Sequence, residues 1–174
     1  MTELTSYIRT VPDFPKPGIL FYDITTLLEH PEGFQLALDR MERFVRSCKP
    51  DSIVAIESRG FLFGAALADR LKIGVIPVRK IGKLPSETIS QEYALEYGTD
   101  HVEIHSDSIE PGDKVVIVDD LIATGGTIAA TCKLVQRLGG KVAGISAVIE
   151  LSFLPWRDVL KNYNVNYLIS FDSE

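Results

Sequence analysis

The sequence is poor in cysteine and contains no long apolar run. Only two of its 174 residues are cysteines, and Cys48 and Cys132 are too far apart to form a metal-ligand motif. This pattern predicts two reduced, buried thiols rather than a disulfide framework or a zinc site. No apolar stretch approaches the roughly 20 residues that cross a bilayer. The first residues also lack the basic and apolar regions of a signal peptide, so we expect a cytoplasmic protein.

Positive charge is scarce as well. The chain has 18 lysines and arginines against 24 acidic residues, which gives a formal net charge of −6 and a pI of about 5.1. A general basic surface for nucleic acid is therefore not expected, and anions can be bound only at a local site. The three histidines, His30, His101 and His105, lie in polar segments without the carboxylates or thiols of a metal site. We interpret them as surface residues.

The apolar residues that are present follow strand and helix patterns in alternation. Residues 52–56 and 115–118 are continuous apolar runs, typical of strands buried on both faces of a parallel sheet. Residues 32–46 have helical periodicity. Further strands are predicted at 74–78, 88–95, 101–105, 142–149 and 167–169, and further helices at 2–10, 60–71, 127–138 and 156–163. This alternation predicts an α/β fold with a mainly parallel sheet flanked by helices, in a single domain over residues 1–174.

The strongest chemical signal lies in residues 115–127. An apolar strand leads to Asp119 and Asp120, at the sheet edge where open α/β folds bind ligands. A small turn then leads into a helix start, where free backbone amides and hydroxyl groups can bind phosphate. The residues of this turn are Ala123, Thr124, Gly125, Gly126 and Thr127. They match neither the G-x-x-x-x-G-K-[ST] loop nor the G-x-G-x-x-G loop, which excludes those nucleotide-binding classes.

The two aspartates further restrict the class of ligand that the site can bind. Carboxylates would repel a bare phosphate, but they suit a phosphate attached to a sugar, because sugar hydroxyls donate hydrogen bonds to Asp119 and Asp120. A cation is expected nearby. The alternative is an ordinary capped helix start that follows two surface acids. The coincidence of this motif with its expected strand and helix favours the sugar-phosphate interpretation.

The segment 115–127 resembles the motif with which type I phosphoribosyltransferases bind 5-phosphoribosyl-1-pyrophosphate (PRPP). Four apolar residues and two acids precede a turn that ends in Thr-Gly-Gly-Thr. From Pro12 onward the chain is similar to the adenine branch of this family. The matching stretches are Pro12-Asp13-Phe14-Pro15, Pro17-Gly18, Ser58-Arg59-Gly60-Phe61, Arg79-Lys80, Gly82-Lys83-Leu84-Pro85 and Leu95-Glu96-Tyr97-Gly98.

This resemblance implies the type I phosphoribosyltransferase fold, with a small base-binding hood within residues 1–30 and a flexible flap over residues 83–105. It implies an enzyme that transfers the phosphoribosyl group of PRPP to adenine, giving AMP and pyrophosphate in purine salvage. Mg²⁺ would orient and neutralise the diphosphate, carried by PRPP rather than by direct protein ligands. A homodimer is also expected, because basic residues of this family can reach a neighbouring subunit's site.

The resemblance also assigns roles to the PRPP-binding residues. Residues 123–127 would bind the 5′-phosphate, and Asp119 and Asp120 would bind the ribose hydroxyls as part of the catalytic machinery. A non-proline cis peptide is implied at Glu57–Ser58. Four basic residues are expected to bind pyrophosphate, although isolated surface cations are the alternative. These are Arg59, Arg79, Lys80 and Lys83.

The flap and the hood complete the expected site. Glu96 would exchange a proton with the purine as the general acid or base, and Tyr97 would help to close the flap against water. Phe21 would stack on the base, while main-chain groups near Leu20 and Tyr22 read its edge. Tyr22 departs from the arginine often found there. The alternatives are a surface position for Glu96 and core packing for Phe21.

Two other functions compete with this one. The first is a phosphoribosyltransferase for hypoxanthine, guanine or xanthine, which the hood and the Leu-Glu-Tyr-Gly stretch disfavour. The second is a non-catalytic PRPP-binding regulator. Such a regulator needs a DNA-binding element, and an acidic chain of this length has no room for an added module.

Overall fold

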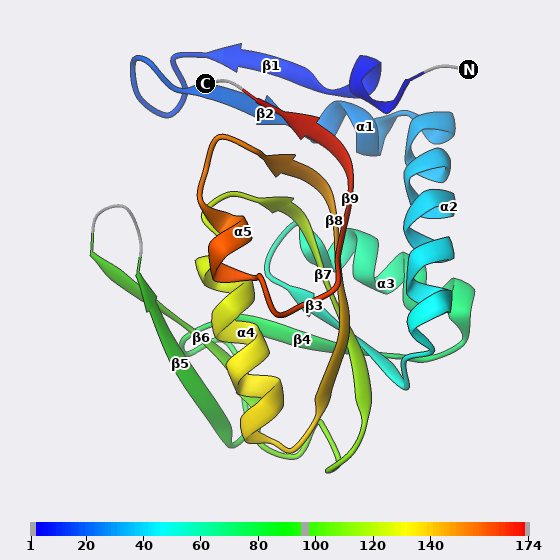
Figure 1. The fold of residues 1–174 in the computed structure, drawn as a ribbon, viewed down its shortest axis with the longest axis vertical. Helices are drawn as coiled ribbons and strands as arrows, with labels where there is room; N and C mark the ends of the chain where they lie inside the picture. Colours follow the sequence, from blue (N-terminus) through cyan, green and yellow to red (C-terminus); the bar gives the residue numbers. More distant parts are fainter. Residues whose placement is uncertain (1–2, 95–97, 173–174) are drawn as a thin grey trace.

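A seven-stranded sheet forms the centre of the computed structural model, which describes residues 3–94 and 98–172 (Figure 1). The strand order is β5-β6-β4-β3-β7-β8-β9. Neighbours from β4 to β9 run parallel, whereas β6 is antiparallel to both β4 and β5. The strands are β3 (Ser52–Ile56), β4 (Gly74–Lys80), β5 (Thr88–Ala94), β6 (Thr99–His105), β7 (Lys114–Ile122), β8 (Lys141–Leu151) and β9 (Val165–Phe171). The predicted mainly parallel α/β fold is confirmed.

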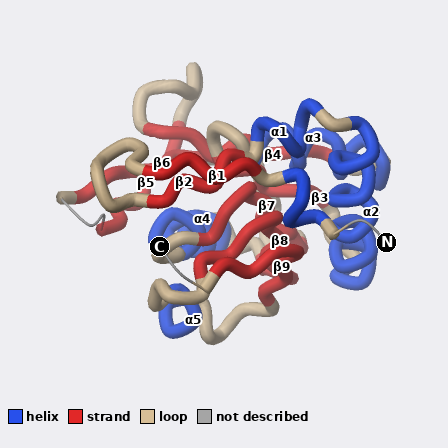
Figure 2. Tube along the Cα trace, turned by 90° about the horizontal axis from the view of Figure 1, so that it is seen from above, coloured by secondary structure: helices blue, strands red, loops and turns tan. Residues whose placement is uncertain are grey.

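Helices cover both faces of this sheet (Figure 2). The helices α2 (Pro31–Cys48) and α3 (Gly60–Leu71) pack on one face, and α4 (Gly126–Arg137) packs on the other. Successive strand residues point to opposite faces, so Val54 joins the core under α4 while Ala55 joins the core under α2 and α3. Since both faces are buried, the strands have continuous apolar runs. Two short helices, α1 (Thr25–Glu29) and α5 (Trp156–Val159), also occur in the described part of the chain.

The N-terminal segment differs from the helix predicted over residues 2–10. Its described part is a 3-10 helix, Leu4–Tyr7, followed by β1 (Arg9–Pro12). β1 pairs antiparallel with β2 (Leu20–Asp23), and this hairpin lies across the carboxyl ends of the central strands (Figure 1). The Nη2 atom of Arg9 lies 2.6 Å from Oδ2 of Asp23 on the opposite strand. Pairing with a segment farther along the chain overrides the local helical pattern.

Two further elements differ in detail from the sequence-based expectation. The helix predicted over residues 156–163 ends at Val159, and the last strand is longer than residues 167–169. Pro77 lies within β4, although proline usually occupies strand ends or irregular positions because it has no N–H to donate. It pairs with Ala55 of β3 on one side, whereas β6 pairs with β4 at Arg79 and Lys80. The missing N–H of Pro77 therefore falls beyond the paired part of the β4–β6 edge.

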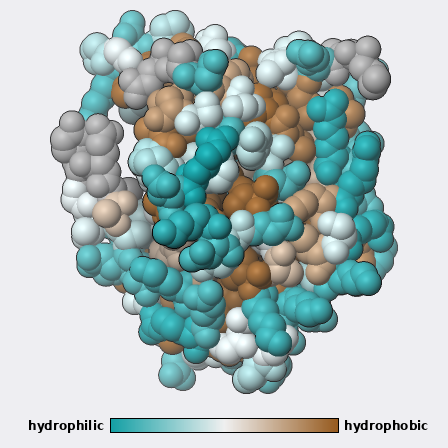
Figure 3. All heavy atoms as spheres, in the orientation of Figure 1, coloured by the Kyte–Doolittle hydropathy of each residue, from teal (hydrophilic) through white to brown (hydrophobic). Residues whose placement is uncertain are grey.

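The face of the molecule in Figure 3 is mainly hydrophilic, with small apolar areas between polar side chains. Within residues 3–94 and 98–172, no helix combines the length and the apolar character needed to cross a membrane. Cys48 in α2 and Cys132 in α4 are free thiols, and Cys132 is buried as predicted while Cys48 is half-buried.

Candidate active site

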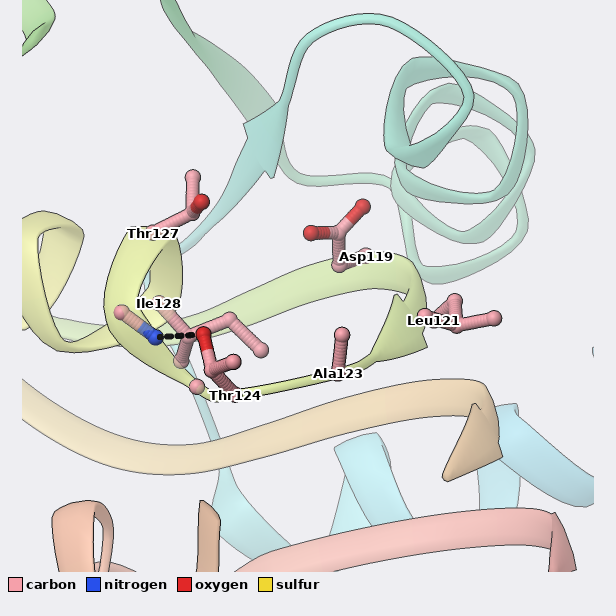
Figure 4. A pocket seen from close by; sticks show the side chains of 8 residues that line it. Asp119, Leu121, Ala123, Thr124, Thr127 and Ile128 are labelled. Carbon is pink, nitrogen blue, oxygen red and sulfur yellow. Dashed lines mark hydrogen bonds between the residues drawn. The ribbon is translucent and has the colours of Figure 1, made fainter. Parts of the chain in front are cut away.

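The candidate site lies at the carboxyl edge of the sheet, where β3 and β7 end. β7 continues to Ile122, so Asp119 and Asp120 belong to the strand itself rather than to the turn after it. A pocket of about 80 Å³ opens beside them, and in Figure 4 the side chains of Asp119 and Thr127 lie on the same side of its loop. The pocket is lined by Asp119, Leu121, Ala123, Thr124, Gly125, Gly126, Thr127 and Ile128. The structure thus brings the predicted phosphate loop and the first aspartate together.

The loop has the backbone geometry of an anion-binding turn. Gly125 has a φ of +80° and caps the N-terminus of α4, a conformation that favours glycine. The Gly126 N–H donates a weak 3.4 Å hydrogen bond to Thr124 Oγ1 (Figure 4). The first amides of a helix have no partner within the helix and carry the positive end of its dipole. An oxyanion seated in the loop would satisfy them.

The two aspartates are buried side by side. They are 9% and 6% exposed, and the Asp120 N–H donates to Asp119 Oδ1 at 2.8 Å. Burial, with the adjacent Asp120 charge, raises the pKa of Asp119 well above its ordinary value. Burial also raises the pKa of Asp120, although the Arg59 guanidinium opposes this change. Two neighbouring buried acids with raised pKa values are typical of a site that binds hydroxyl donors or a cation.

Arg59 joins the turn after β3 to the end of β7. Its Nε atom lies 2.8 Å from Oδ2 of Asp120. The pair is in contact without hydrogen-bond geometry, and this buried Oδ2 accepts no hydrogen bond from the described residues. Gly60 permits the approach: a Cβ there would lie 2.9 Å from Val118 O and 3.0 Å from Asp119 Oδ1. The Asp120 carboxylate is therefore a buried acceptor at the centre of the site.

Glu57 collects two of the predicted pyrophosphate-binding residues. Its carboxylate accepts hydrogen bonds from Arg79 Nη2 at 3.1 Å and from Lys83 Nζ at 2.7 Å. Burial alone would raise the pKa of Glu57, but the hydrogen bonds from Arg79 and Lys83 outweigh it and lower the pKa to about 2. The peptide bond Glu57–Ser58 is cis, as the resemblance implies. Sequence reasoning missed this carboxylate, although its position at the end of β3 could have indicated it.

Lys80 does not join this cluster. Its Nζ contacts the Tyr93 hydroxyl and the Asp100 carboxylate, which lie on β5 and β6. Burial would lower the pKa of Lys80, but the hydrogen bonds that its ammonium donates to Asp100 and Tyr93 raise the pKa overall. The four predicted cations therefore divide into three groups: Arg59 on Asp120, Arg79 and Lys83 on Glu57, and Lys80 on the β5–β6 hairpin.

Glu103 is a second acid that sequence reasoning missed. It is 5% exposed on β6 and accepts the backbone N–H groups of Lys83 at 3.0 Å and Leu84 at 2.9 Å. Burial would raise the pKa of Glu103, but the backbone hydrogen bonds lower it. Its position between apolar residues of a strand was the available signal. Glu103 thus holds the segment that carries Lys83.

A second hollow, of about 340 Å³, lies between the N-terminal hairpin and the turn after β3. It is lined by Val11, Phe14, Phe21, Asp23, Thr25 and Arg59. The rings of Phe14 and Phe21 meet edge to face, with their centroids 5.0 Å apart. The Arg59 Cζ atom lies 5.7 Å from the Phe21 centroid. Arg59 therefore borders both the aspartates and the hollow that Phe21 lines.

Tyr22 and Leu20 relate to this hollow differently from Phe21. The Tyr22 side chain is 5% exposed and stacks on Phe171 with centroids 3.8 Å apart, so it packs into the core. Leu20 is partly buried against the same core. Only the main chain of these two residues is suited to the recognition role predicted for them. Glu96 and Tyr97, which were predicted to act in the flap, lie outside the described residues, and their roles stay predictions.

Comparison with known proteins places this geometry in a family. Residues 23–152 match the phosphoribosyl transferase domain. An adenine phosphoribosyltransferase from a Synechococcus species is 52% identical over 170 residues, which cover 98% of this chain and 99% of the relative. The crystal structure of adenine phosphoribosyltransferase from Thermoanaerobacter pseudethanolicus superposes with a TM-score of 0.93 at 52% identity, covering 97% and 98% of the two chains.

A second solved structure carries ligands. Adenine phosphoribosyltransferase from Saccharomyces cerevisiae, complexed with adenine and an imino-altritol bisphosphate, superposes with a TM-score of 0.89 at 43% identity. The match covers 95% of this chain and 96% of the yeast chain.

Proposed function

The chain belongs to the phosphoribosyl transferase domain family, and from this premise we propose how its site makes a nucleotide. It transfers the 5-phosphoribosyl group from PRPP to adenine, giving AMP and pyrophosphate, as an adenine phosphoribosyltransferase of purine salvage. The observation that carries our account of the site is the pair of buried carboxylates, Asp119 and Asp120, on β7 just before the glycine loop. Buried carboxylates in that place are suited to accept hydrogen bonds from the hydroxyl groups of a ligand.

A sugar phosphate explains why the glycine loop and the two aspartates lie side by side. The amides and hydroxyls of residues 123–127 bind the 5′-phosphate at the start of α4. The ribose hydroxyls donate to Asp119 and Asp120, whose buried charges lack sufficient compensation in the free protein. A bare phosphate would be repelled by the same two carboxylates. The site therefore favours a phosphate that arrives attached to a diol.

The basic residues are suited to the leaving group. As the bond from the ribose to pyrophosphate breaks, negative charge builds up on pyrophosphate and positive charge on the sugar ring. Arg59, Arg79 and Lys83 stabilise the former, and the aspartates lie near the latter. In the structure Arg59 lies against Asp120, and Arg79 and Lys83 lie against Glu57. Lys80 reaches pyrophosphate only by leaving Tyr93 and Asp100.

Mg²⁺ fits the charge of this site. The two buried aspartates with raised pKa values supply negative charge that a cation would relieve. The diphosphate and diol of PRPP would hold the ion, with Asp119 and Asp120 nearby. When bound, Mg²⁺ neutralises the diphosphate of PRPP.

Adenine binds in the hollow of about 340 Å³ beneath the N-terminal hairpin. Phe21 supplies an aromatic face, and the main chain near Leu20 and Tyr22 reads the purine edge, which distinguishes an amino group from a carbonyl. Glu96 exchanges a proton with the purine, and Tyr97 closes the flap of residues 83–105 over the site. A closed flap excludes water, which would otherwise compete with adenine for the sugar.

The molecular setting is also part of this proposal. The chain acts as one domain of 174 residues, with the hood in residues 1–30, and it forms a homodimer. The free thiols of Cys48 and Cys132 support a reducing compartment, the cytoplasm.

The test is the chromatographic detection of AMP after mixing the chain with adenine, PRPP and Mg²⁺, with hypoxanthine, guanine and xanthine assayed in parallel.

The variant Asp120→Asn should lower kcat/KM for PRPP by roughly ten- to a hundredfold, since it weakens an acceptor for the diol. Its circular dichroism spectrum should match that of the unchanged chain. Faster turnover of hypoxanthine than of adenine would refute the adenine preference, and unchanged kinetics of Asp120→Asn would refute the role of the diol.

A further inference from the structure

A buried carboxylate outside the proposed site lies beside the end of β7. Glu150 of β8 has no exposed surface. In the sheet it is paired with Ile122, the last residue of β7 before the phosphate loop, and with Ser170 of β9. The reaction described above does not use this group. A buried charge persists only where it has several partners.

Glu150 has three donors from the segment that follows it. The Trp156 Nε1–H donates to Oε2 at 2.6 Å, Arg157 Nη2 donates to Oε1 at 2.7 Å, and the Ser170 hydroxyl donates to Oε1 at 2.8 Å. The Arg157 guanidinium also lies over the Trp156 ring, 4.5 Å from its centroid. One carboxylate thus anchors the short helix α5 to the carboxyl edge of the sheet (Figure 1).

Trp156 connects this anchor to the phosphate loop. A Cβ atom on Gly125 would lie 3.3 Å from Cβ of Trp156 and 3.4 Å from Cγ of Leu160. Trp156 and Leu160 are 4% and 1% exposed, so they form a packed wall behind the turn. On its other side the loop meets the β5–β6 hairpin, since a Cβ on Gly126 would lie 3.2 Å from Ala94 O. The loop is held between two elements, and Glu150 fixes one of them.

We propose that Glu150 is a positioning residue for phosphate binding, acting through Trp156 on the turn at Gly125. This inference rests on the proposed function and adds a residue to it. The loop must present its amides in one arrangement before the 5′-phosphate arrives, and ordering it in advance lowers the cost of binding. The effect belongs to PRPP affinity rather than to the chemical step. Adenine binds in a different hollow and should be unaffected.

The primary variant is Trp156→Phe, which keeps an aromatic body behind Gly125 and removes the donor to Glu150. We expect the KM for PRPP to rise about tenfold, as for the loss of one hydrogen bond to a charged group, with kcat and the KM for adenine within about twofold of the unchanged chain. Glu150→Gln should act in the same direction. The double variant should be little worse than either single one, since both break the same connection.

The matched control is Val159→Ala, on the same helix but with a side chain that is 45% exposed; its KM for PRPP should not change. Ser170→Ala, which removes one donor and leaves Trp156 in place, should raise that KM by about two- to threefold and provides a milder test. A purely structural role would lower the melting temperature of these variants and leave the KM for PRPP unchanged, and that result would overturn the inference.

The same assays separate this inference from the proposed function. If the unchanged chain forms AMP and Trp156→Phe retains its KM for PRPP, the positioning role is overturned and the function stands. If the unchanged chain forms no AMP from adenine and PRPP, the proposed function is overturned, and the positioning role falls with it.

Discussion

At the scale of single residues, the site is built from carboxylates whose environments differ in opposite ways. Asp119 and Asp120 are buried without enough compensation, which raises the pKa of each. Glu57 is surrounded by donors that lower its pKa to about 2. The first pair is therefore suited to take on a ligand's donors, whereas Glu57 holds cations of its own in place.

The raised pKa of Asp119 predicts that its charged carboxylate, which the proposed function needs, lowers the free energy of unfolding. In Asp119→Asn the amide oxygen can still accept the Asp120 N–H, but the buried charge is removed. We expect the free energy of unfolding at pH 7 to increase by roughly 1 kcal/mol while kcat/KM falls at least about tenfold. Urea denaturation and steady-state kinetics measure the two effects.

The pH dependence of that difference follows from the direction of the shift. Because the folded-state pKa of Asp119 exceeds the unfolded value of 3.8, the native chain loses stability as the pH rises from about 4 through the folded-state pKa. The gain from Asp119→Asn should therefore be present at neutral pH and vanish below about pH 4. A variant that is less stable than the unchanged chain at pH 7 would contradict this account.

Glu57 should show the opposite pH dependence. Its pKa is lowered from 4.5 to about 2, so its stabilising contribution is present above about pH 4.5 and is lost as the pH falls toward 2. We expect Glu57→Gln to lower the free energy of unfolding by about 1 kcal/mol at pH 7, a modest value because the Lys83 partner is half exposed. Urea denaturation at pH 7, 4.5 and 3 should show the difference shrinking.

Glu92→Gln is the control for that experiment. Glu92 is an exposed acid of β5 that faces His101, so its replacement should change stability little at any of these pH values. A loss of stability in Glu57→Gln that stays constant from pH 7 to pH 3 would show that charge is not its cause.

At the scale of elements, the site depends on how closely α3 approaches β7. A Cβ at Gly60 would lie 2.9 Å from the Val118 carbonyl, a backbone atom that cannot rotate away. Gly60→Ala should therefore move the start of α3, with Arg59, away from Asp120. We expect a loss of about 1–3 kcal/mol in the free energy of unfolding and a higher KM for PRPP, measured by thermal denaturation and kinetics.

Gly74→Ala gives the matched control for the approach of α3. Gly74 begins β4, and a Cβ there would meet no atom within 4 Å. Its stability should stay within about 0.5 kcal/mol of the unchanged chain. If Gly60→Ala were as well tolerated as Gly74→Ala, the close contact between α3 and β7 would not limit the site.

At the scale of the whole molecule, segments far apart in the chain meet at the ligand sites. The N-terminal hairpin, the turn after β3 and the loop after β7 all contribute, and a ligand that contacts them favours the folded state of the entire chain. At about 100 times its Kd, PRPP with Mg²⁺ should add about 2.7 kcal/mol. This corresponds to a rise of roughly 5–10 °C in Tm by scanning calorimetry. Asp120→Asn should show a much smaller rise, and an equal rise would contradict the placement of PRPP.

The sequence by itself determined the features that are contiguous in the chain. Apolar runs predicted the buried strands, helical periodicity predicted α2, and residues 115–127 predicted a strand, a phosphate loop and a helix start in that order. These features could be predicted because each depends on neighbouring side chains and on the backbone freedom of glycine. The mainly parallel sheet follows from the alternation of such segments.

Only the tertiary structure decided which distant groups meet. It paired Arg59 with Asp120, placed Arg79 and Lys83 on Glu57, and replaced the predicted N-terminal helix with a short 3-10 helix and the first strand of a hairpin. It also set Trp156 behind Gly125. These contacts join residues from about 8 positions apart, in the hairpin, to about 60 positions apart, for Arg59 and Asp120, and they depend on strand order and register, which local patterns do not encode. The residue type determines the chemistry of each group, whereas the packing of the chain determines which partner the group contacts.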